Sequence, residues 1–474
     1  MKPLFLNPPT FEDFDGGAGA RYQASREVTS FWYPTWLCYP AGMIEGSRVV
    51  DAPVQRLTLD ECLKIACDYD MVVIYTSTPT LRIDTETARR IKAQKPATVT
   101  VLTGPHVTIL PEETLQFTAG AVDIVCRGEF DYAIKELCEG RAWDAVAGIS
   151  FMKEGAFCHT PDRPVLTDLD ALPFVSQIYK RDLPVNDYII PHIKNPYVSI
   201  YTSRGCPARC TFCLWPQTYS GHAMRTRSPE NVYQEVKWIK ENLPQVRDIS
   251  FDDDTFSADR RHARAVAELI KPLGVSWVIN ARANCDYETL KIMRDAGLHH
   301  VIVGYESGNE QILKNIKKGV TRAQAEEFTR NCKKLGITIH GAFIMGLPGE
   351  TRETIRDTIE YAKKLDLESI QVSLASPYPG TEFYEQCRRE GWIVSETFLD
   401  DTGHQSCVIG YPHLSNQEIF DAVELFYSKF YFRPKYILRS IGRMIVDGEE
   451  RKKLLKEGKQ YFDYMRKRKQ SSAR

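Results

Sequence analysis

Three cysteines lie close together near the middle of the chain. Cys206, Cys210 and Cys213 form a C-x3-C-x2-C array within RGCPARCTFCLWPQ, with Phe212 between the last two. A tetrahedral zinc site usually has four protein ligands, often as two separated pairs, and the nearest fourth candidate here is His222. Three thiolates on a cubane iron–sulfur cluster instead leave one iron without a protein ligand. The array alone therefore fits either a structural metal or an open, reactive cluster.

An iron atom with an open position suits a small chelating molecule. S-adenosylmethionine (SAM) offers an amine and a carboxylate for chelation, and an electron from a [4Fe–4S] cluster can cleave its sulfonium bond to give a 5′-deoxyadenosyl radical. The protein would then orient and shield that radical. We therefore expect a [4Fe–4S] cluster on the three cysteines, with SAM at the open iron.

Polar residues follow two further predicted strands. FDDDTF supplies Asp252, Asp253 and Asp254, whose carboxylates suit an ammonium group or ribose hydroxyls, although Asp is also common in solvated turns. NARAN supplies Asn280 and Arg282, and an Arg side chain binds a carboxylate through two parallel hydrogen bonds. Both segments are candidate SAM contacts.

The next predicted strands also end in residues suited to a ligand. Glu306 in GYESG is expected to pair with Arg282 or to bind SAM. Gly346 and Pro348 in GLPGET predict a tight turn that lets the backbone approach an adenine closely. Four side chains near these strand ends are unranked candidate donors in the reaction: Tyr305, Glu306, Tyr378 and His222.

The strands that carry these loops belong to a repeating strand–helix pattern over residues 196–395. Six runs are predicted as strands: YVSIYTSRG, DISFDDDTF, VSWVINAR, HHVIVGYESG, TIHGAFIMGLPG and SIQVSLASPYPG. Helical patterns fill the gaps at 229–242, 259–272, 287–296, 309–315, 322–335 and 351–365. Six βα units predict a partial TIM-type barrel, with functional groups at the carboxyl ends of its strands.

Residues 1–150 show a second strand–helix alternation. Strands are predicted within 3–9, 71–79, 98–106 and 122–130, with helices at 59–68 and 84–94. The pattern favours an α/β, Rossmann-like doubly wound sheet, but no GxGxxG supports a nicotinamide or flavin cofactor. Residues 151–195 are rich in Pro and Asp, which predicts a connector.

Residues 396–474 are predicted to be helical and basic. Over 431–474 there are fourteen Lys and Arg against five Asp and Glu. One interpretation is a solvated helical appendage. The other is a surface that rests on anionic lipid, because YFRPKYILRSIGRMI combines aromatic, aliphatic and cationic side chains.

Composition is typical of a soluble globular protein. Of the 474 residues, 43% are hydrophobic and 26% charged, and a net charge of −1 gives no attraction to nucleic acid. Ten of the thirteen cysteines are scattered along the chain, which, with no visible secretory leader, favours a reducing cytoplasm, and no apolar run is long enough for a membrane span. We expect a cytoplasmic protein of two or three domains, with peripheral contact at the inner face of the membrane as an alternative.

The sequence resembles the radical SAM superfamily, in the branch with an N-terminal cobalamin-binding-type domain. The resemblance is carried by the cysteine array, RTRSPENVYQEV, FDDDTF, GYESGNEQILKNIKKG and GLPGET, and by TGPHVTILPEETL and DIVCRGEFDYAIKEL near the N-terminus. It implies a [4Fe–4S] cluster, SAM and an electron donor such as flavodoxin or ferredoxin.

The same resemblance leaves cobalamin binding open. The D-x-H-x-x-G motif of base-off cobalamin proteins is missing, as it is in many relatives of this branch. Ser77, Thr78 and Gly104 are candidate corrin contacts, and His106 is a candidate ligand, although a histidine in a turn often has a structural role.

A narrower resemblance lies at the ends of the chain. LFLNPPTFEDFDGGAGARYQASREVTSFWYPTWL, CTFCLWPQT and EIFDAVELFYSKFYFRPKYI are similar to radical SAM proteins associated with hopanoid biosynthesis. That similarity implies a hopanoid lipid substrate and contraction of the pyranose ring of a glucosaminyl headgroup, which gives the cyclitol ether of bacteriohopanetetrol. The alternatives are a cobalamin-dependent radical methyltransferase of a lipid or secondary metabolite, and an iron–sulfur electron carrier without turnover.

Overall fold

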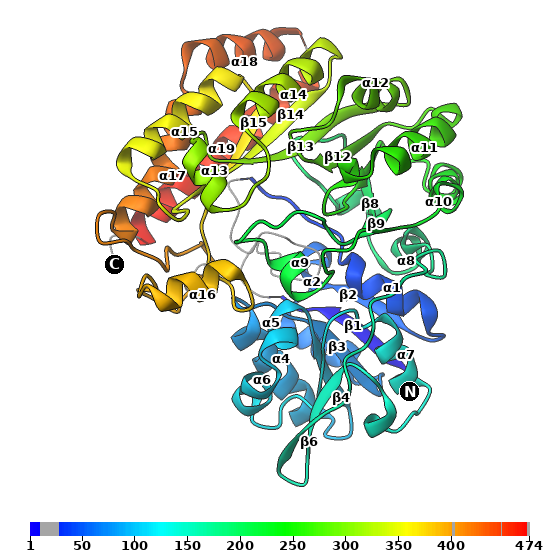
Figure 1. Ribbon diagram of the computed structural model, residues 1–474. Helices are drawn as coiled ribbons and strands as arrows, with labels where there is room; N and C mark the ends of the chain where they lie inside the picture. Colours follow the sequence, from blue (N-terminus) through cyan, green and yellow to red (C-terminus); the bar gives the residue numbers. More distant parts are fainter. Residues whose placement is uncertain (10–27, 401–402, 447, 472–474) are drawn as a thin grey trace.

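The computed structural model describes residues 1–9, 28–400, 403–446 and 448–471, so the Gly-rich segment 15–23 lies outside the described residues. Two sheets dominate the molecule (Figure 1). The N-terminal sheet lies at the bottom of the view, the second sheet lies above it, and the last helices cover the far side. The predicted α/β fold class, with a doubly wound domain, a partial barrel and a helical C-terminal region, is confirmed.

The first sheet is mainly parallel and has the spatial order β2-β1-β3-β4-β5-β6-β7. Its strands are β1 (Pro3–Asn7), β2 (Arg48–Asp51), β3 (Met71–Tyr75), β4 (Val99–Thr103), β5 (Ile124–Cys126), β6 (Ile149–Lys153) and β7 (Ala156–His159). The strand order reverses between β1 and β3, the place where such sheets bind ligands beyond the carboxyl ends of the strands.

Short helices connect and cover this sheet. They are α1 (Thr35–Met43), α2 (Ala52–Gln55), α3 (Leu59–Ala66), α4 (Leu81–Gln94), α5 (Pro105–Ile109), α6 (Pro111–Thr118), α7 (Asp131–Cys138) and the 3₁₀ turn η1 (Trp143–Ala145). The predicted boundary at residue 150 falls inside β6, and β6 and β7 pair antiparallel at the sheet edge. The connector therefore begins after β7, and it contains α8 (Val175–Asp182) and η2 (Val185–Asp187).

The second sheet is an open, fully parallel barrel of six strands in the order β8-β11-β12-β13-β14-β15. They are β8 (Tyr197–Ile200), β11 (Asp248–Phe251), β12 (Trp277–Ala281), β13 (Leu298–Glu306), β14 (Thr338–Met345) and β15 (Ser369–Leu374). Five lie within their predicted runs, and β13 begins one residue before its own. A small antiparallel pair, β9 (Ser203–Arg204) and β10 (Arg225–Thr226), stands beside the first strand.

Six helices of the barrel lie at the predicted places: α10 (Pro229–Asn242), α11 (Arg260–Ile270), α12 (Tyr287–Asp295), α13 (Glu310–Asn315), α14 (Arg322–Lys334) and α15 (Arg352–Leu365). Two further helices, α9 (Leu214–Thr218) and α16 (Glu382–Arg389), and the 3₁₀ turns η3 (Phe256–Ala258) and η4 (Lys271–Leu273) were not predicted. Local signals explain the starts of α10 and α14: Ser228 accepts from the Asn231 amide ahead of Pro229, and Thr321 and Gln324 form a capping box.

Three C-terminal helices close the far side of the barrel: α17 (Asn416–Tyr431), α18 (Pro434–Val446) and α19 (Gly448–Ser471). The hydroxyls of Tyr427 and Tyr431 on α17 accept hydrogen bonds from the amides of Val372 and Ile370, at 2.9 and 3.0 Å. These bonds satisfy donors on the edge strand β15, which would otherwise be open to pairing with another chain.

Buried charges lie between the two sheets. The Arg204 guanidinium is 2.8 Å from Asp131, and that of Arg225 is 2.8 Å from Glu129, with all four side chains largely buried. Trp36 on α1 stacks over Arg204, with the guanidinium carbon 4.7 Å from its ring centre. Because Arg204 and Arg225 belong to β9 and β10, these contacts fix the loop that starts at residue 205 against the first sheet.

Candidate active site

The cysteine loop leaves the first barrel strand through a glycine turn. Gly205 has φ of +90°, and a Cβ on it would lie 2.3 Å from the carbonyl oxygen of Ala223, so no other residue fits. The Cys206 amide donates to Gly221 O at 3.2 Å, and the His222 Nδ1 lies 3.2 Å from Cys206 O. His222 therefore holds the backbone of the loop, and it does not line the cavity described below, contrary to its prediction as a donor.

One side chain organises the rest of this loop. The Gln217 amide nitrogen on α9 donates to the carbonyls of Cys210, Thr211 and Cys213, at 3.1, 3.2 and 2.7 Å. Its oxygen accepts from the Glu382 amide at 2.8 Å. Converging carbonyls in a tight loop need a donor when they are withdrawn from water, and Gln217 supplies it.

A cavity of about 320 Å³ lies at the carboxyl ends of the barrel strands, and we call it the front cavity. Cys206, Cys210, Phe212 and Cys213 line one side of it. Six further predicted or newly found polar residues line it from the strand ends and nearby loops: Asp254, Asn280, Arg282, Glu306, Lys318 and Tyr378. The structure therefore gathers the three thiols and most of the predicted polar groups around one space.

The surroundings of the thiols suit a cluster of iron and sulfide. An Arg282 nitrogen lies 4.0 Å from the Cys210 sulfur, and cationic neighbours stabilise thiolates. Within the described ranges, no three His, Cys, Asp or Glu side chains are arranged to hold a metal ion. A cubane cluster does not need such a convergence, because each thiolate binds a different iron. The donor set fits a [4Fe–4S] cluster better than a zinc ion.

The three aspartates after β11 have different surroundings. Only Asp254 lines the front cavity, where it accepts from the Ser220 hydroxyl at 3.1 Å. Asp252 accepts from the side-chain amide of Asn280 at 2.7 Å, and Asp253 accepts from the Thr202 and Ser203 amides at 2.6 and 2.8 Å. Burial raises the pKa of Asp253 to about 6 despite these bonds. The prediction of ligand contacts is therefore wrong for Asp252 and Asp253, which brace the strand ends.

The predicted pairing of Glu306 with Arg282 is replaced by another ion pair. A bulge in β13 between Gly304 and Glu306 turns the Glu306 carboxylate toward Lys318, 2.6 Å from its ammonium nitrogen, with both side chains buried. Burial alone would lower the pKa of Lys318, but the Glu306 carboxylate beside it raises that pKa above its usual value. Arg282 instead donates to the carbonyl oxygen of Lys318. The pair places a fixed charge of each sign in the cavity wall.

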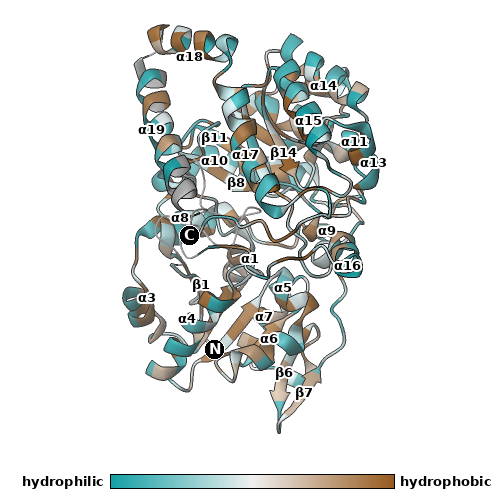
Figure 2. Cartoon of the chain, turned by 90° about the vertical axis from the view of Figure 1, so that its left-hand side faces the viewer, coloured by the Kyte–Doolittle hydropathy of each residue, from teal (hydrophilic) through white to brown (hydrophobic). Residues whose placement is uncertain are grey.

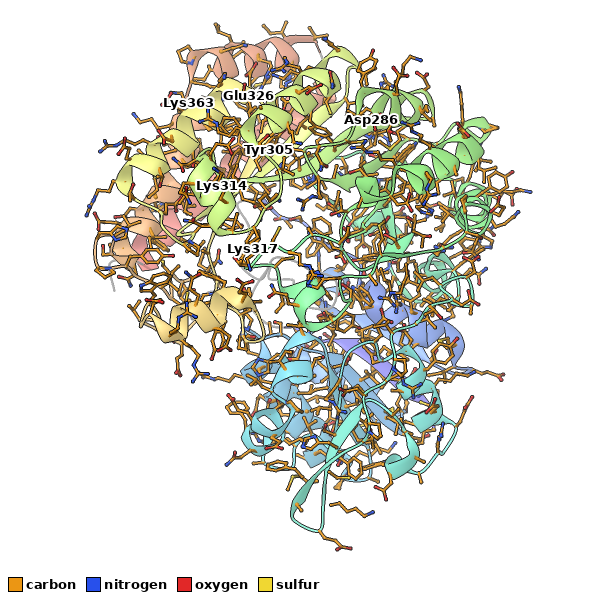
Figure 3. All side chains as sticks on the ribbon, in the orientation of Figure 1. Asp286, Tyr305, Lys314, Lys317, Glu326 and Lys363 are labelled. Atoms are coloured by element: carbon orange, nitrogen blue, oxygen red, sulfur yellow. The ribbon has the colours of Figure 1, made fainter. Side chains whose placement is uncertain are left out.

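Tyr305 points away from the cavity. Its hydroxyl is 2.6 Å from that of Thr329 on α14, and its ring stacks on Phe343 with ring centres 5.7 Å apart (Tyr305 is labelled in Figure 3). Ile302, Gly304 and Glu306 line the front cavity, whereas Tyr305 does not. The prediction of Tyr305 as a reaction donor is wrong. Tyr378 does line the front cavity, its ring stacks on Phe398 at 5.2 Å, and burial raises its pKa to about 12.

The turn after β14 faces the C-terminal helices. The Gly346 amide donates to Glu350, and its carbonyl accepts from the Tyr411 hydroxyl at 2.7 Å. The carbonyl of Pro348 accepts from Asn315 at 2.8 Å. Neither Gly346 nor Pro348 lines the front cavity, so the prediction of an adenine contact at this turn is wrong.

The first sheet supplies the opposite wall of the front cavity. Tyr75 at the end of β3 and Pro105 at the start of α5 line it, and Tyr75 stacks near Trp215 of α9 with ring centres 6.4 Å apart. The predicted corrin contacts lie at the same strand ends. Gly104 has φ of +121°, and a Cβ there would lie 2.3 Å from Thr76 O. This wall therefore joins the ligand-binding edge of one sheet to the cysteine loop of the other.

Buried polar atoms at these strand ends fit a polar ligand such as a corrin. Thr78 bonds the Nδ1 of His106 at 3.0 Å, whereas the His106 Nε2 and the Tyr75 hydroxyl are buried with no hydrogen-bond partner among the described residues. Burial lowers the pKa of His106 to about 4, so its ring is neutral. Ser77 bonds Thr80, at 2.9 Å between their hydroxyls, and shapes the turn rather than offering a free group. Orphan groups of this kind usually have a partner supplied from outside the chain.

Sequence reasoning missed three residues of this site. Lys318 stands in the run KNIKKG, which looks like an exposed basic turn. Gln217 stands in an ordinary LWPQT segment, and Tyr75 ends a strand that is buried on both faces. Only Tyr75 could have been found from the sequence, because it ends a run of β-branched residues and therefore lies at a strand end.

Comparisons with known proteins agree with this arrangement. Residues 200–362 match the model of the radical SAM superfamily, and residues 24–138 match that of the B12 binding domain. An uncharacterized methyltransferase of Pyrococcus horikoshii is 31% identical over 93% of this chain and 95% of its own length. The hopanoid C-3 methylase of Methylococcus capsulatus is 24% identical over 64% of this chain and 58% of its own.

A solved structure shows the same architecture. The radical SAM methyltransferase TsrM from Kitasatospora setae, with cobalamin and a [4Fe–4S] cluster bound, superposes with a TM-score of 0.67 over 97% of this chain and 99% of its own length. The sequence identity is 16%, so the likeness concerns the fold.

Proposed function

Because this chain belongs to the radical SAM superfamily, with a B12-binding domain before its barrel, we propose that it is a cobalamin-dependent methyltransferase of a hopanoid or similar lipid. The expected cofactors, a [4Fe–4S] cluster, SAM and cobalamin, are those that the two matched families imply. The methyl transfer and the lipid substrate are the proposed part.

One observation supports methyl transfer over the other reactions. The front cavity is bounded by the three cysteines on one side and by Tyr75 and Pro105 of the B12-binding domain on the other. When bound, the cluster and SAM supply a 5′-deoxyadenosyl radical and the cobalamin supplies a methyl group. A substrate in this cavity would be within reach of both, which a ring contraction does not require.

The residues of the chain have distinct tasks in this scheme. Cys206, Cys210 and Cys213 hold the cluster, and Gln217 fixes the backbone between them. Arg282 and the Glu306–Lys318 pair provide fixed charges for the amino and carboxylate groups of SAM. Burial of this wall keeps stray hydrogen donors from reaching a radical in the cavity.

The side facing the B12-binding domain has its own task. The Tyr75 hydroxyl and the His106 Nε2 would donate to or accept from groups at the corrin edge, because both are buried without a partner among the described residues. An external electron donor such as flavodoxin or ferredoxin would reduce the cluster.

Ring contraction of a glucosaminyl hopanoid remains the second candidate. It is favoured by the resemblance of the segments that flank the two domains to radical SAM proteins of hopanoid biosynthesis. The relative named hopanoid C-3 methylase supports a hopanoid substrate but methyl transfer as the reaction.

Anaerobic reconstitution tests the proposal. The protein would be loaded with iron, sulfide and hydroxocobalamin, and incubated with SAM, dithionite and a hopanoid extract from a strain lacking the gene. We expect 5′-deoxyadenosine, S-adenosylhomocysteine and a lipid heavier by one methylene. A cyclitol ether without S-adenosylhomocysteine would establish ring contraction instead. An intact cluster that gives no 5′-deoxyadenosine would overturn both reactions.

A further inference from the structure

A second and larger cavity lies at the opposite end of the barrel, and we call it the back cavity. Its volume is about 520 Å³, within the range of small-molecule sites. The barrel side is formed by residues at the amino-terminal ends of the last three strands, such as His300, His340 and Ser369. The other side is formed by α17, α18 and α19.

The helical side of the back cavity is mostly aromatic. It presents six rings: Tyr427, Tyr431, Phe432, Tyr436, Tyr461 and Phe462. The histidines of the barrel side are held in place, because His340 bonds the Ser369 hydroxyl at 2.7 Å and stacks on His192 at 4.2 Å. Burial lowers the pKa of His340 to about 4, so its ring is neutral at physiological pH. Glu368, Arg443 and Glu457 also line the cavity, but most of its lining is aromatic or apolar, which suits a ligand with a large hydrocarbon part.

The two cavities meet at one residue of the barrel. Gln371 on β15 lines both, and the inward residues of β14 run from His340 at the back cavity to Ile344 at the front. Four residues of strand separate these two levels by about 13 Å. A ligand with one end in each cavity would have to pass the Gln371 side chain.

The helices over the back cavity have an unusual outer surface. Asp366 anchors α18 through Arg433, the residue just before the helix, and through Arg439 within it, at 2.9 and 3.6 Å. The outer face exposes Leu438, Ile441, Ile445 and Val446, with 70%, 47%, 78% and 88% of each residue accessible. Figure 2 shows the brown turns of α18 at the outer edge of the molecule. Isolated exposed aliphatic residues are ordinary, but four on one helix face mark an interaction surface.

The charges near this face indicate what it contacts. Arg451, Lys452, Lys456 and Lys459 are exposed on α19, and Lys435 near the start of α18 is exposed but paired with Asp366 at 2.8 Å. Within the described residues no helix is long and apolar enough to cross a bilayer. An apolar helix face next to basic side chains is typical of helices that lie in the interface of an anionic membrane.

We infer that the back cavity binds the hydrocarbon body of a membrane lipid, and that the outer face of α18 rests on the bilayer that supplies it. The inference depends on the proposed function only for the reacting headgroup, which would extend past Gln371 to the front cavity. The binding itself requires neither SAM nor an electron.

Filling the back cavity tests the binding site. Gly458 on α19 lines the cavity, and a Cβ there would meet no atom within 4 Å, so a side chain can start at this position without a clash, and Gly458→Phe introduces a ring at the cavity wall. Gly442→Phe on α18 is the matched control, since it has the same free space but does not line the cavity. In titrations with the fluorescent fatty acid cis-parinaric acid, we expect Gly458→Phe to bind at least about tenfold more weakly than the control. Equal binding by both variants would overturn the site.

Vesicle flotation tests the membrane face. Full-length protein is mixed with vesicles of phosphatidylcholine and phosphatidylglycerol, and we expect it to float with them at low salt. The double variant Leu438→Asp, Ile445→Asp should remain in the lower fraction, whereas Val394→Asp, at an exposed residue of the barrel side, should float normally. Flotation of the double variant would overturn the membrane contact. A wild-type protein that is dimeric in solution, with a double variant that is monomeric, would also overturn it, because the face would then contact a second copy of the chain.

These readouts are separate from turnover. Parinaric acid binding without 5′-deoxyadenosine formation would leave the lipid site in place and refute only the reaction. Loss of lipid binding in Gly458→Phe with unchanged SAM cleavage in the absence of lipid would support the back cavity specifically.

Discussion

The two ends of the barrel are built from the same strands but differ in charge. At the front end, Glu306, Lys318, Arg282 and Asp254 line a cavity with the cysteines. At the back end, histidines face six aromatic rings, and the charged residues Glu368, Arg443 and Glu457 are a small part of the lining. Fixed charges beside the cysteines suit the end where ionic cofactors bind, and a mostly aromatic wall suits an apolar ligand. The contrast shows that one parallel sheet can hold two chemically opposite environments about 13 Å apart.

The largest expected effect concerns the cysteines of the front end. Replacing Cys206, Cys210 and Cys213 by Ala removes every thiolate ligand of the cluster. We expect the visible absorbance of the reconstituted protein and its 5′-deoxyadenosine formation to fall to background. Parinaric acid binding at the back end should be unchanged. Retained SAM cleavage would refute the assignment of these ligands.

The ion pair of the front end gives the next effect. Glu306→Gln leaves the buried Lys318 ammonium without its partner, which should reduce the free energy of unfolding by about 3–5 kcal/mol. The matched control is Glu326→Gln, which breaks the partly exposed pair with Lys364 and should cost about 1 kcal/mol or less. Chemical denaturation of both variants measures the difference. Equal losses would mean that Glu306 is not buried with its partner.

The two ends should respond to pH in opposite directions. Glu350, in the turn after β14, is buried and its pKa is raised to about 8 by that burial. A raised acid pKa means that the folded protein holds a proton that the unfolded chain loses, so stability falls as pH rises from about 5 to 8. Glu350→Gln should remove roughly 3 kcal/mol of this fall, as measured by denaturation at both pH values. A parallel decline in the variant would contradict the prediction.

His340 gives the opposite response at the back end. Its pKa is lowered to about 4 by burial, so the unfolded chain takes up a proton near pH 6.5 that the folded protein does not. The contribution of His340 to the free energy of unfolding is fully present above pH 6.5 and is lost as the pH falls toward 4. Between pH 7 and 5 we expect His340→Gln to remove roughly 2 kcal/mol of the decline, measured by the same denaturation. A variant as sensitive to acid as the wild type would show that His340 is protonated in the folded protein.

The smallest effect separates Tyr305 from Tyr378. Tyr305→Phe loses the bond to Thr329 and should reduce stability by about 1 kcal/mol, with 5′-deoxyadenosine formation unchanged. Tyr378→Phe, within the front cavity, should alter the ratio of product formed to SAM cleaved. A change in that ratio for Tyr305→Phe would show that Tyr305 does take part in the reaction.

Much of the architecture could be predicted because hydrophobic periodicity and turn residues act locally. All six barrel strands and the helices after them follow from these signals. The short strand β2 was missed because four residues, Arg48–Asp51, carry too little periodic signal. The strands β6 and β7 were assigned to the connector because their antiparallel pairing joins the sheet only through the tertiary fold.

The candidate site was predicted in position but only partly in role. Strand ends could be located, whereas the direction of each side chain depends on bulges and loop geometry. The bulge next to Glu306 turns that residue toward Lys318, and the loop after β11 places only Asp254 in the cavity. Lys318, the partner of Glu306, lies in a basic run that looks like an exposed turn. Neither the bulge nor this ion pair can be recognised from the spacing of residues in the sequence.

Gln371 stands where the back cavity meets the front one, and this has a consequence for selectivity. When the tail of a ligand lies among the aromatic rings, the length of the ligand determines how far its other end extends along the barrel. A molecule of the right length places one carbon beside the cluster loop, and shorter or longer homologues place a different carbon there. The back cavity, where no reaction takes place, would then determine which bond of the substrate reacts.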